Sequence, residues 1–306
     1  MSDTSTPRTE RSDYQATSDP ALLRSADRGE VALLDYGQLY ALWERQQWAT
    51  QDLDFTQDRI DWHERIGEDE RFQRMYGLSA FFIGEERVAS ELGPMMRAAP
   101  QEDMRVFLCT QIADEARHVA FFDRFYSQVG VLEAGDLAGR LQETSAHLNP
   151  EFGVLFDEML KRRVDRLAVE PEDLETLVEA VTIYHMVVEG MLALTGQHFI
   201  MDYNERVGTL PAFVQGFTLV ARDEHRHVAF GARFLRDMTQ RDPRYAEAIQ
   251  RTLGEVLPVA DGVLRPSWIT DDDEPTLFGV STNETRAFAL KALERRMKVI
   301  GLLQAA

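Results

Sequence analysis

The chain contains only one cysteine among its 306 residues. An intramolecular disulfide is therefore excluded, and this usage is typical of a reducing compartment. Cys109 lies in an apolar run, residues 106–109, which predicts that its thiol packs in the core. The N-terminus lacks the apolar stretch of a signal peptide, and no uninterrupted apolar run approaches membrane-spanning length. These absences predict a cytoplasmic protein that is not inserted in a membrane.

Positive charge is also scarce. The 33 Lys and Arg residues are outnumbered by 52 Asp and Glu residues, which gives a formal net charge of −19. Such a chain has little with which to neutralise phosphates, which argues against a nucleic-acid partner, and an anionic membrane surface would repel it. Carboxylates that bind cations add to the formal charge without appearing on the surface, so part of this acidity can be internal.

Alternating polar and apolar segments of the kind that form β-strands are lacking as well, and helical periodicity dominates. The expected helices cover residues 37–50, 71–98, 101–129, 150–168, 171–204, 209–240, 243–257 and 282–303. Four of them approach about 30 residues, or about 45 Å at 1.5 Å per residue, and long helices with short connections favour an all-α bundle. We expect residues 1–20 to be a disordered tail and residues 21–306 to form a single helical domain.

Some helix ends are marked in the sequence. Gly130 and Gly208 fall where helices should stop, since glycine readily adopts the left-handed conformation of a helix C-terminus. Ser281 followed by Glu284 fits a capping box for the last helix. Residues 259–280, which contain prolines and an acidic run, predict a long loop before it.

A nine-residue motif occurs twice. Residues 114–122 read Asp-Glu-Ala-Arg-His-Val-Ala-Phe-Phe and residues 223–231 read Asp-Glu-His-Arg-His-Val-Ala-Phe-Gly, so seven of nine positions match. Each copy contains Glu-x-x-His, which is Glu115 with His118 and then Glu224 with His227. Residues three apart on a helix are separated by about 300°, so both side chains project from one face and can bind one ion. Two copies predict a two-metal site.

Each motif follows a long helix with a glutamate in an apolar setting. These are Glu85, beside the adjacent Glu86, and Glu189 between two apolar stretches. An unpaired carboxylate there would be strongly penalised by desolvation, so we expect four glutamates and two histidines to converge inside the bundle. Two divalent cations would offset the four negative charges. The ligand types favour iron or manganese over a structural zinc site, and they do not distinguish the two metals. By spacing alone, Glu86 could replace Glu85.

Asp114 and Asp223 precede the motif glutamates in both copies. Histidines that bind metals usually donate their second ring nitrogen to a carboxylate, which makes these aspartates candidate partners of the two histidines. Surface salt bridges to Arg117 and Arg226 are an equally good interpretation.

This order of ligands on long helices resembles the ferritin-like dimetal-carboxylate proteins. Within them, roughly residues 70–240 look like the small subunit of class I ribonucleotide reductase. The resemblance implies a ferritin-like four-helix core with additional helices, and a homodimer. Three features depart from the reductase pattern: Phe122 stands where the radical-bearing tyrosine is expected, Glu85 replaces the usual aspartate, and residues 301–306 contain no tyrosine.

Val88, three residues after Glu85, and Tyr184, five before Glu189, would by themselves indicate ordinary helix packing. Their positions are similar to those of a pair found in ribonucleotide-reductase-like ligand-binding oxidases. In that family a manganese/iron centre activates O2 and joins a tyrosine oxygen to a valine β-carbon, and a long-chain fatty acid lies beside the metals. The resemblance implies one manganese and one iron ion, with di-iron as the variant, and an oxidoreductase that uses O2. Its implied ligands are Glu85, Glu115 and His118 for manganese and Glu189, Glu224 and His227 for iron, with Glu115 as a bridge.

Two other functions fit part of the sequence. A reductase small subunit that lacks the radical tyrosine would also have Phe122 and Glu85 at these positions. A non-catalytic bundle that binds metal or lipid belongs to a different class, and it would bind fatty acid without metal-dependent O2 consumption. The physiological substrate is not specified by any of these patterns.

Overall fold

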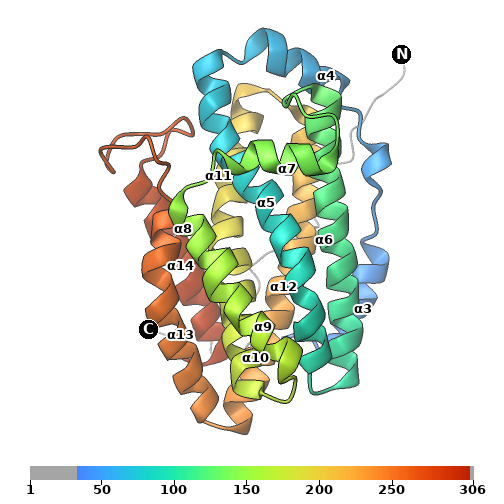
Figure 1. Cartoon of the computed structure of the whole chain (residues 1–306), viewed down its shortest axis with the longest axis vertical. Helices are drawn as coiled ribbons and strands as arrows, with labels where there is room; N and C mark the ends of the chain where they lie inside the picture. The colour runs from blue at the N-terminus through green and yellow to red at the C-terminus, as the bar shows by residue number, and fades with distance from the viewer. Residues whose placement is uncertain (1–32, 304–306) are drawn as a thin grey trace.

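The computed structural model describes residues 33–303, and within this range it is helical without a strand (Figure 1). The predicted tail, residues 1–20, lies outside the described residues. The all-α prediction is confirmed, and the elements fall close to the predicted ranges. Between the last two helices, Pro275 and Ser281 form an isolated antiparallel bridge.

The longest connection is the loop of residues 264–281 between the last two helices, and most of the helices follow one another with short connections. In chain order they are α3 (Tyr36–Arg45), η1 (Thr50–Asp52), α4 (Thr56–Ile60), η2 (Asp61–Arg65), α5 (Glu68–Ala98), α6 (Glu102–Val129), α7 (Leu137–Ser145), α8 (Pro150–Gly153), η3 (Val154–Leu160), α9 (Lys161–Val169), α10 (Leu174–Val181), η4 (Thr182–Ala193), α11 (Leu194–Val207), α12 (Pro211–Arg241), α13 (Arg244–Val263) and α14 (Thr282–Ile300). Four long rods, α5, α6, α10–η4–α11 and α12, form the centre of the bundle (Figure 1). Helix α3 packs on α6 and α12, and α13 and α14 pack on η4.

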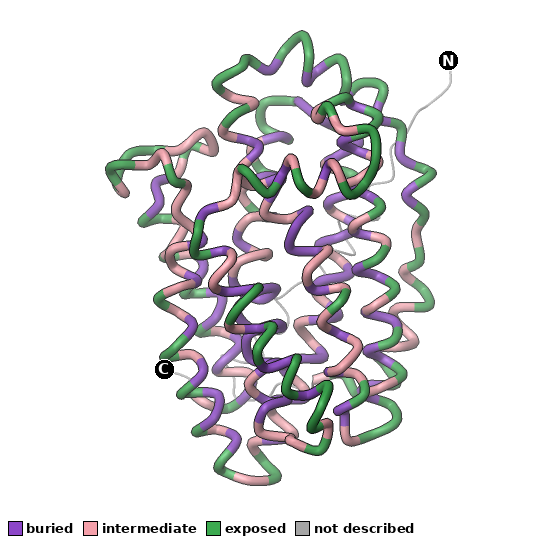
Figure 2. The backbone as a smooth tube through the Cα atoms, viewed as in Figure 1, coloured by how far each residue is buried: buried purple, intermediate pink, exposed green. Residues whose placement is uncertain are grey.

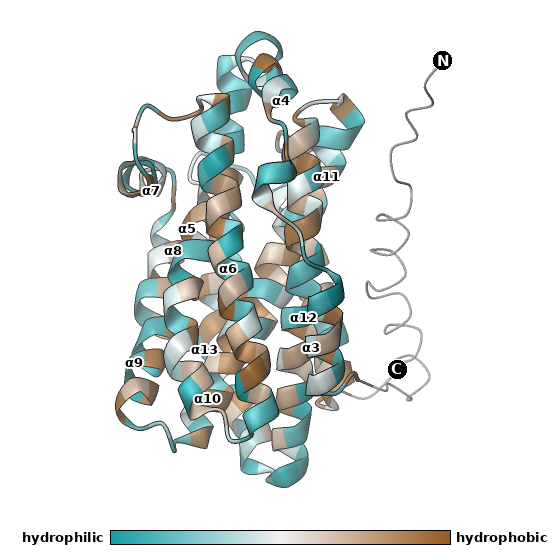
Figure 3. Cartoon of the chain, turned by 90° about the vertical axis from the view of Figure 1, so that its right-hand side faces the viewer, coloured by the Kyte–Doolittle hydropathy of each residue, from teal (hydrophilic) through white to brown (hydrophobic). Residues whose placement is uncertain are grey.

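Three of the segments, η2, η3 and η4, are π-helical, with hydrogen bonds from residue i to i+5. Segment η4 joins α10 to α11 without a break, so the single helix predicted for residues 171–204 has a wide central part. This joined helix, Leu174–Val207, is apolar and long enough to cross a membrane, but 78% of its most apolar window is buried in the bundle. Its apolar character is therefore accounted for by the core (Figures 2 and 3).

The predicted helix ends are confirmed. Gly130 and Gly208 follow α6 and α11 with φ of 75° and 67°, in the left-handed region. Ser281 accepts a hydrogen bond from the backbone of Glu284, and the Glu284 side chain accepts one from the backbone of Ser281. These caps set where the helices of the bundle begin and end.

The start of α12 depends on a residue far away in sequence. Leu210 has φ of 53° and supplies no side-chain cap, and Pro211 occupies the first turn. Asp58 of α4 instead accepts hydrogen bonds from the backbone N–H groups of Ala212 and Phe213 at 3.0 and 3.1 Å. A buried carboxylate from another segment therefore caps the helix that contains the second motif.

Two local predictions were wrong, and two short segments were missed. Helix α13 continues through Pro258 to Val263, because the turn beyond the proline remains packed through its buried residues, so the loop is shorter than expected. Helix α7 and the α4–η2 segment were not predicted, since both are short and polar. Cys109 is exposed, not buried: on α6, Phe107 and Leu108 face the core while residues 106 and 109 lie on the outer side.

Gly216 of α12 lies against the α6 side of the bundle. A Cβ atom at this position would lie 2.2 Å from a ring carbon of Phe121 and 2.7 Å from the Leu53 side chain. Gly216→Ala is therefore expected to lower the free energy of unfolding by about 1–3 kcal/mol, the usual range for overpacking. Chemical denaturation would measure it. Gly254→Ala, at an exposed position of α13 where a Cβ would meet nothing within 4 Å, is the matched control and should be neutral or slightly stabilising. Equal losses in the two variants would contradict this explanation.

Candidate metal centre

Four central segments each contribute to one buried cluster of carboxylates and imidazoles. Glu85 comes from α5, Glu115 and His118 from α6, Glu189 from η4, and Glu224 and His227 from α12. All six residues are at most 5% exposed. The structure therefore brings together the full set of ligands that the sequence predicts.

The cluster divides into two groups able to hold a metal ion. One consists of Glu85, Glu115, His118 and Glu224, and the other consists of Glu115, Glu189, Glu224 and His227; within each group the potential ligand atoms lie within 4.8 Å of one another. Glu115 and Glu224 belong to both groups. The family resemblance implied one bridging glutamate, Glu115, and the geometry gives Glu224 the same shared position.

The structure distinguishes Glu85 from Glu86. The Oε2 atom of Glu85 lies 3.2 Å from Nδ1 of His118, inside the cluster. Glu86 is partly exposed and forms an ion pair with Arg87. Glu85 is thus the residue placed to bind a metal.

Burial acts strongly on the carboxyl groups. It raises the pKa of Glu85 to about 8 and that of Glu189 to about 7. Burial, reinforced by the charge of Glu189, raises the pKa of Glu224 well above its usual range. Without cations, protons must therefore remain on part of this cluster at neutral pH.

The carboxylates around the two histidines stabilise their protonated forms. Burial disfavours their protonated forms, but the carboxylates around them, led by Glu85 for His118 and Glu115 for His227, raise both pKa values well above the usual range. For Glu115, burial is outweighed by the two imidazoles, led by His227, which hold its pKa well below the usual range.

Three buried oxygens in the cluster test whether it suits metal ions. The Oε2 atoms of Glu115, Glu189 and Glu224 have no hydrogen-bond partner among the described residues. Buried carboxylate oxygens that accept no hydrogen bond are costly, and divalent cations would satisfy all three. The residues present therefore fit a pair of metal ions with oxygen and imidazole ligands.

The two aspartates contact the histidines in an exchanged arrangement. Asp223 of the second motif lies 3.4 Å from Nε2 of His118, and Asp114 of the first motif lies 3.2 Å from Nε2 of His227. Each histidine thereby points its Nδ1 atom at the glutamates: Nδ1 of His118 lies 3.3 Å from Glu115, and Nδ1 of His227 lies 3.2 Å from it. The aspartates thus orient the nitrogens that face the candidate metal site.

Two tryptophans near the end of α3 complete this arrangement. Trp43 Nε1 donates to Asp114 at 3.0 Å, and Trp48 Nε1 donates to Asp223 at 2.7 Å. The sequence analysis did not predict either residue, since both lie outside the repeated motif. A buried indole N–H usually has a hydrogen-bond acceptor. The two tryptophans, which lie close together before the first long helix, could therefore have indicated partners for the buried aspartates.

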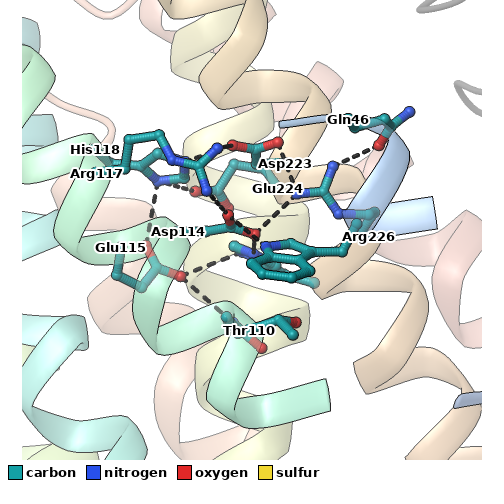
Figure 4. A network of polar contacts seen from close by, with 12 residues as sticks. Gln46, Thr110, Asp114, Glu115, Arg117, His118, Asp223, Glu224 and Arg226 are labelled. Atoms are coloured by element: carbon teal, nitrogen blue, oxygen red, sulfur yellow. Dashed lines mark hydrogen bonds and ion pairs between the residues drawn. The ribbon is translucent and has the colours of Figure 1, made fainter. Parts of the chain in front are cut away.

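Arginines bridge the two aspartates (Figure 4). Arg226 is 2% exposed, and its Nη2 atom lies 2.8 Å from Asp114 and 2.7 Å from Asp223. Arg117 contacts Asp114 at 2.6 Å. The aspartates therefore contact the histidines and also form salt bridges to the arginines. These salt bridges are buried, whereas the second interpretation placed them on the surface. Burial opposes ionisation of Asp223, but His118 and Arg226 hold its pKa well below the usual range.

Asp223→Asn should weaken metal binding at the site of His118 by about 10- to 100-fold. A neutral amide, unlike a carboxylate, does not raise the basicity of the imidazole or fix its orientation as strongly. Anaerobic titration with Mn²⁺ against a chelator measures this affinity. Asp237→Asn is the control, since Asp237 lies on the same helix but pairs with Arg233 and Tyr36. Identical affinities in the two variants would refute the orienting role.

The comparison with known families agrees with this geometry. The family model described as the ribonucleotide reductase small chain matches residues 34–303. The chain belongs to the ribonucleotide reductase small-chain family. Several solved structures of an R2-like ligand-binding oxidase are similar to it. A variant with an aerobically reconstituted Mn/Fe cofactor is 27% identical, with a TM-score of 0.76 over 88% of this chain and 94% of that one. Another variant, with an anaerobically reconstituted Mn/Fe cofactor, is 26% identical with a TM-score of 0.75 and the same coverage.

Within the small-chain family, the radical-bearing tyrosine is expected at the position of Phe122. Phe122 is fully buried and packs among aromatic rings, including those of Phe121, Phe213 and Phe217. Among the described residues, the phenol beside the carboxylate–imidazole cluster is instead that of Tyr184, whose hydroxyl donates to Glu115 Oε1 at 2.7 Å. Any tyrosine chemistry at this centre would therefore involve η4 and not α6.

An apolar cavity of about 170 Å³ adjoins the cluster. Glu85, Glu189 and Glu224 form part of its wall, together with Val88. The other lining residues are mostly apolar and include Phe81, Phe156, Leu192, Phe199, Trp268 and Phe278. Since the last two belong to the loop between α13 and α14, the cavity connects the cluster to a surface loop.

Proposed function

We propose that this protein is an O2-activating oxidase with one manganese and one iron ion, and that a fatty-acid-like ligand occupies the cavity. The observation that carries this proposal is the pair of ligand groups, sharing Glu115 and Glu224, on the wall of an apolar cavity. The Mn/Fe cofactors of the similar R2-like oxidases support the choice of metals. A di-iron centre is the variant that the ligand types equally allow.

In this proposal Glu85, Glu115 and His118 hold manganese, and Glu189, Glu224 and His227 hold iron. When bound, such a pair supplies electrons to O2 and, once oxidised, an oxidant for strong bonds. The chain's own contribution is to exclude water and to place the reacting side chains. The three cavity-lining glutamates mean that an anionic head group in the cavity would face the metal ions, while the apolar walls would cover its chain.

We further propose that Tyr184 and Val88 become covalently joined. A bond forms between the phenol oxygen of Tyr184 and the β-carbon of Val88, the O–H and C–H bonds break, and O2 accepts the two electrons and two protons. Both side chains are buried, Tyr184 at 0% and Val88 at 4% exposure. Tyr184 is hydrogen-bonded to the cluster, and Val88 lies on the cavity wall.

Intact mass and peptide mapping after aerobic loading with manganese and iron test this cross-link. The expected product is a peptide pair that contains Val88 and Tyr184 and lacks two hydrogens. Anaerobically loaded protein and Tyr184→Phe are the controls, and neither should form it. Separate, unmodified peptides after aerobic loading would contradict the proposal.

A reductase small subunit without the radical tyrosine is the second candidate, favoured by Phe122 and by Glu85 as a ligand. Nucleotide reduction with a large subunit would establish it. A non-catalytic metal- or lipid-binding bundle would bind fatty acid but show no metal-dependent O2 consumption, which an oxygen electrode measures. The homodimer and the cytoplasmic location stay predictions.

A further inference from the structure

A buried amide connects Tyr184 to the carboxylates of the candidate metal centre. Gln111 of α6 is 0% exposed, and its Nε2 atom lies 3.1 Å from the phenol oxygen of Tyr184 and 3.0 Å from Glu189 Oε1. The same amide lies 3.5 Å from Glu115. Gln111 therefore contacts two candidate metal ligands and the tyrosine at once, although it lies outside the repeated motif.

The orientation of this amide follows from its partners. Glu189 and Glu115 are carboxyl groups that mainly accept hydrogen bonds, so the NH2 group of Gln111 must face them and its carbonyl oxygen must point away. That oxygen lies 3.1 Å from Nε2 of His185. Burial lowers the pKa of His185 to about 3, so the ring is neutral, and its single N–H can donate to Gln111.

The ring of His185 is itself closely held. It lies against Tyr184 and Phe230, with ring centroids 4.6 and 5.5 Å away. On the α12 side, a Cβ atom at Gly231 would come within 2.3 Å of the His185 Cβ, so α12 approaches as closely as a glycine allows. The imidazole cannot turn far, and the direction of its N–H is fixed.

We propose that His185 and Gln111 act together as positioning residues for the phenol oxygen of Tyr184. His185 fixes the orientation of the Gln111 amide, and the amide holds the phenol oxygen where its O–H can donate to Glu115. The oxygen then has a donor on one side and an acceptor on the other, which leaves one defined position for it at the cluster. This inference rests on the proposed function only in treating that oxygen as the reacting atom.

Gln111→Leu tests the proposal, since leucine keeps much of the side-chain volume but removes both the NH2 donor and the carbonyl acceptor of the amide. In a crystal structure of the metal-free variant, the Tyr184 ring should be displaced from its position in the parent protein. After aerobic loading with manganese and iron, cross-link formation should be slower by about 100-fold, the scale expected for misplacement of a reacting atom by about 1 Å. His185→Phe, which keeps the ring contacts but removes the donor, should shift both measurements in the same direction and serves if Gln111→Leu does not fold.

Gln197→Leu is the matched control. Gln197 is another buried glutamine, 1% exposed, and neither of its amide atoms has a hydrogen-bond partner among the described residues. It should leave Tyr184 and the cross-link unchanged. An undisplaced Tyr184 with parental cross-linking in Gln111→Leu would overturn the proposal. If the parent protein forms no cross-link, the proposed bond between Val88 and Tyr184 is refuted. The position of Tyr184 in the metal-free variant still decides the positioning role: displacement supports it and an unchanged ring overturns it.

Discussion

Glu115→Ala is expected to abolish tight binding of both metal ions, whereas Glu85→Ala should remove only one. Glu115 belongs to both ligand groups, while Glu85 belongs only to the group that contains His118. Loss of a shared carboxylate takes a ligand and a negative charge from each ion, and each ion then retains fewer oxygen ligands than manganese or iron prefers. By the same argument, Glu224→Ala should behave like Glu115→Ala.

Metal content after anaerobic loading and desalting, measured by elemental analysis, distinguishes these outcomes. Glu86→Ala is the control, since this neighbouring glutamate pairs with Arg87 outside the cluster and its loss should leave both ions bound. One tightly bound ion per chain in Glu115→Ala would show that the two sites do not share this ligand.

The metal-free protein should lose stability as the pH rises from about 5 to 8. The pKa of Glu85 is raised from 4.5 to about 8 and that of Glu189 from 4.5 to about 7, in both cases chiefly by burial. Between these values the folded protein keeps protons that the unfolded chain has lost. The stabilisation is complete below pH 4.5 and disappears through pH 7–8, with a slope of about 1.4 kcal/mol per pH unit for each such proton. The raised pKa values of His118 and His227 act in the same direction.

Binding of metal ions replaces these protons, so the stability gained from Mn²⁺ should grow with pH over the same range. Urea unfolding with Mn²⁺ and with a chelator, from pH 5 to 8.5, measures the difference. Asp58, whose pKa burial raises to about 7, adds a similar slope to both curves and cancels in this difference. Glu85→Gln should flatten the metal-free curve. A metal-free curve that rises with pH, or one parallel to the metal-loaded curve, would contradict this account.

Much of the centre could be predicted from local spacing. The spacing of Glu-x-x-His places both side chains on one face of a helix. The apolar periodicity predicted the long helices from α5 to α6 and from α10 to α12. The apolar residues on both sides of Glu189 were also enough to identify it as a candidate ligand, because an unpaired carboxylate there would be costly. The convergence of these residues could be predicted because the helical period of 3.6 residues and the cost of burying charge act within one element.

Contacts that depend on π-helical geometry or on packing between elements could not be predicted in this way. Tyr184 and Glu189 are five residues apart, which on an α-helix would separate them by about 140°, whereas the i to i+5 hydrogen bonds of η4 bring them close to one side. Gln111 belongs to no repeated pattern, and its partners come from η4. The exchange of Asp114 and Asp223 between the two motifs appears only once the helices are packed together.

That exchange has a consequence for how the molecule holds together. The first motif supplies His118, but the aspartate that orients this histidine belongs to the second motif, and the reverse holds for His227. Neither half of the repeat is a self-sufficient metal-binding module. A pair of ions bound here would fasten the α5–α6 hairpin to the η4–α12 side, so metal retention would report the integrity of the whole bundle. Chains cut in the connection after α9 should hold metal only when both fragments are present.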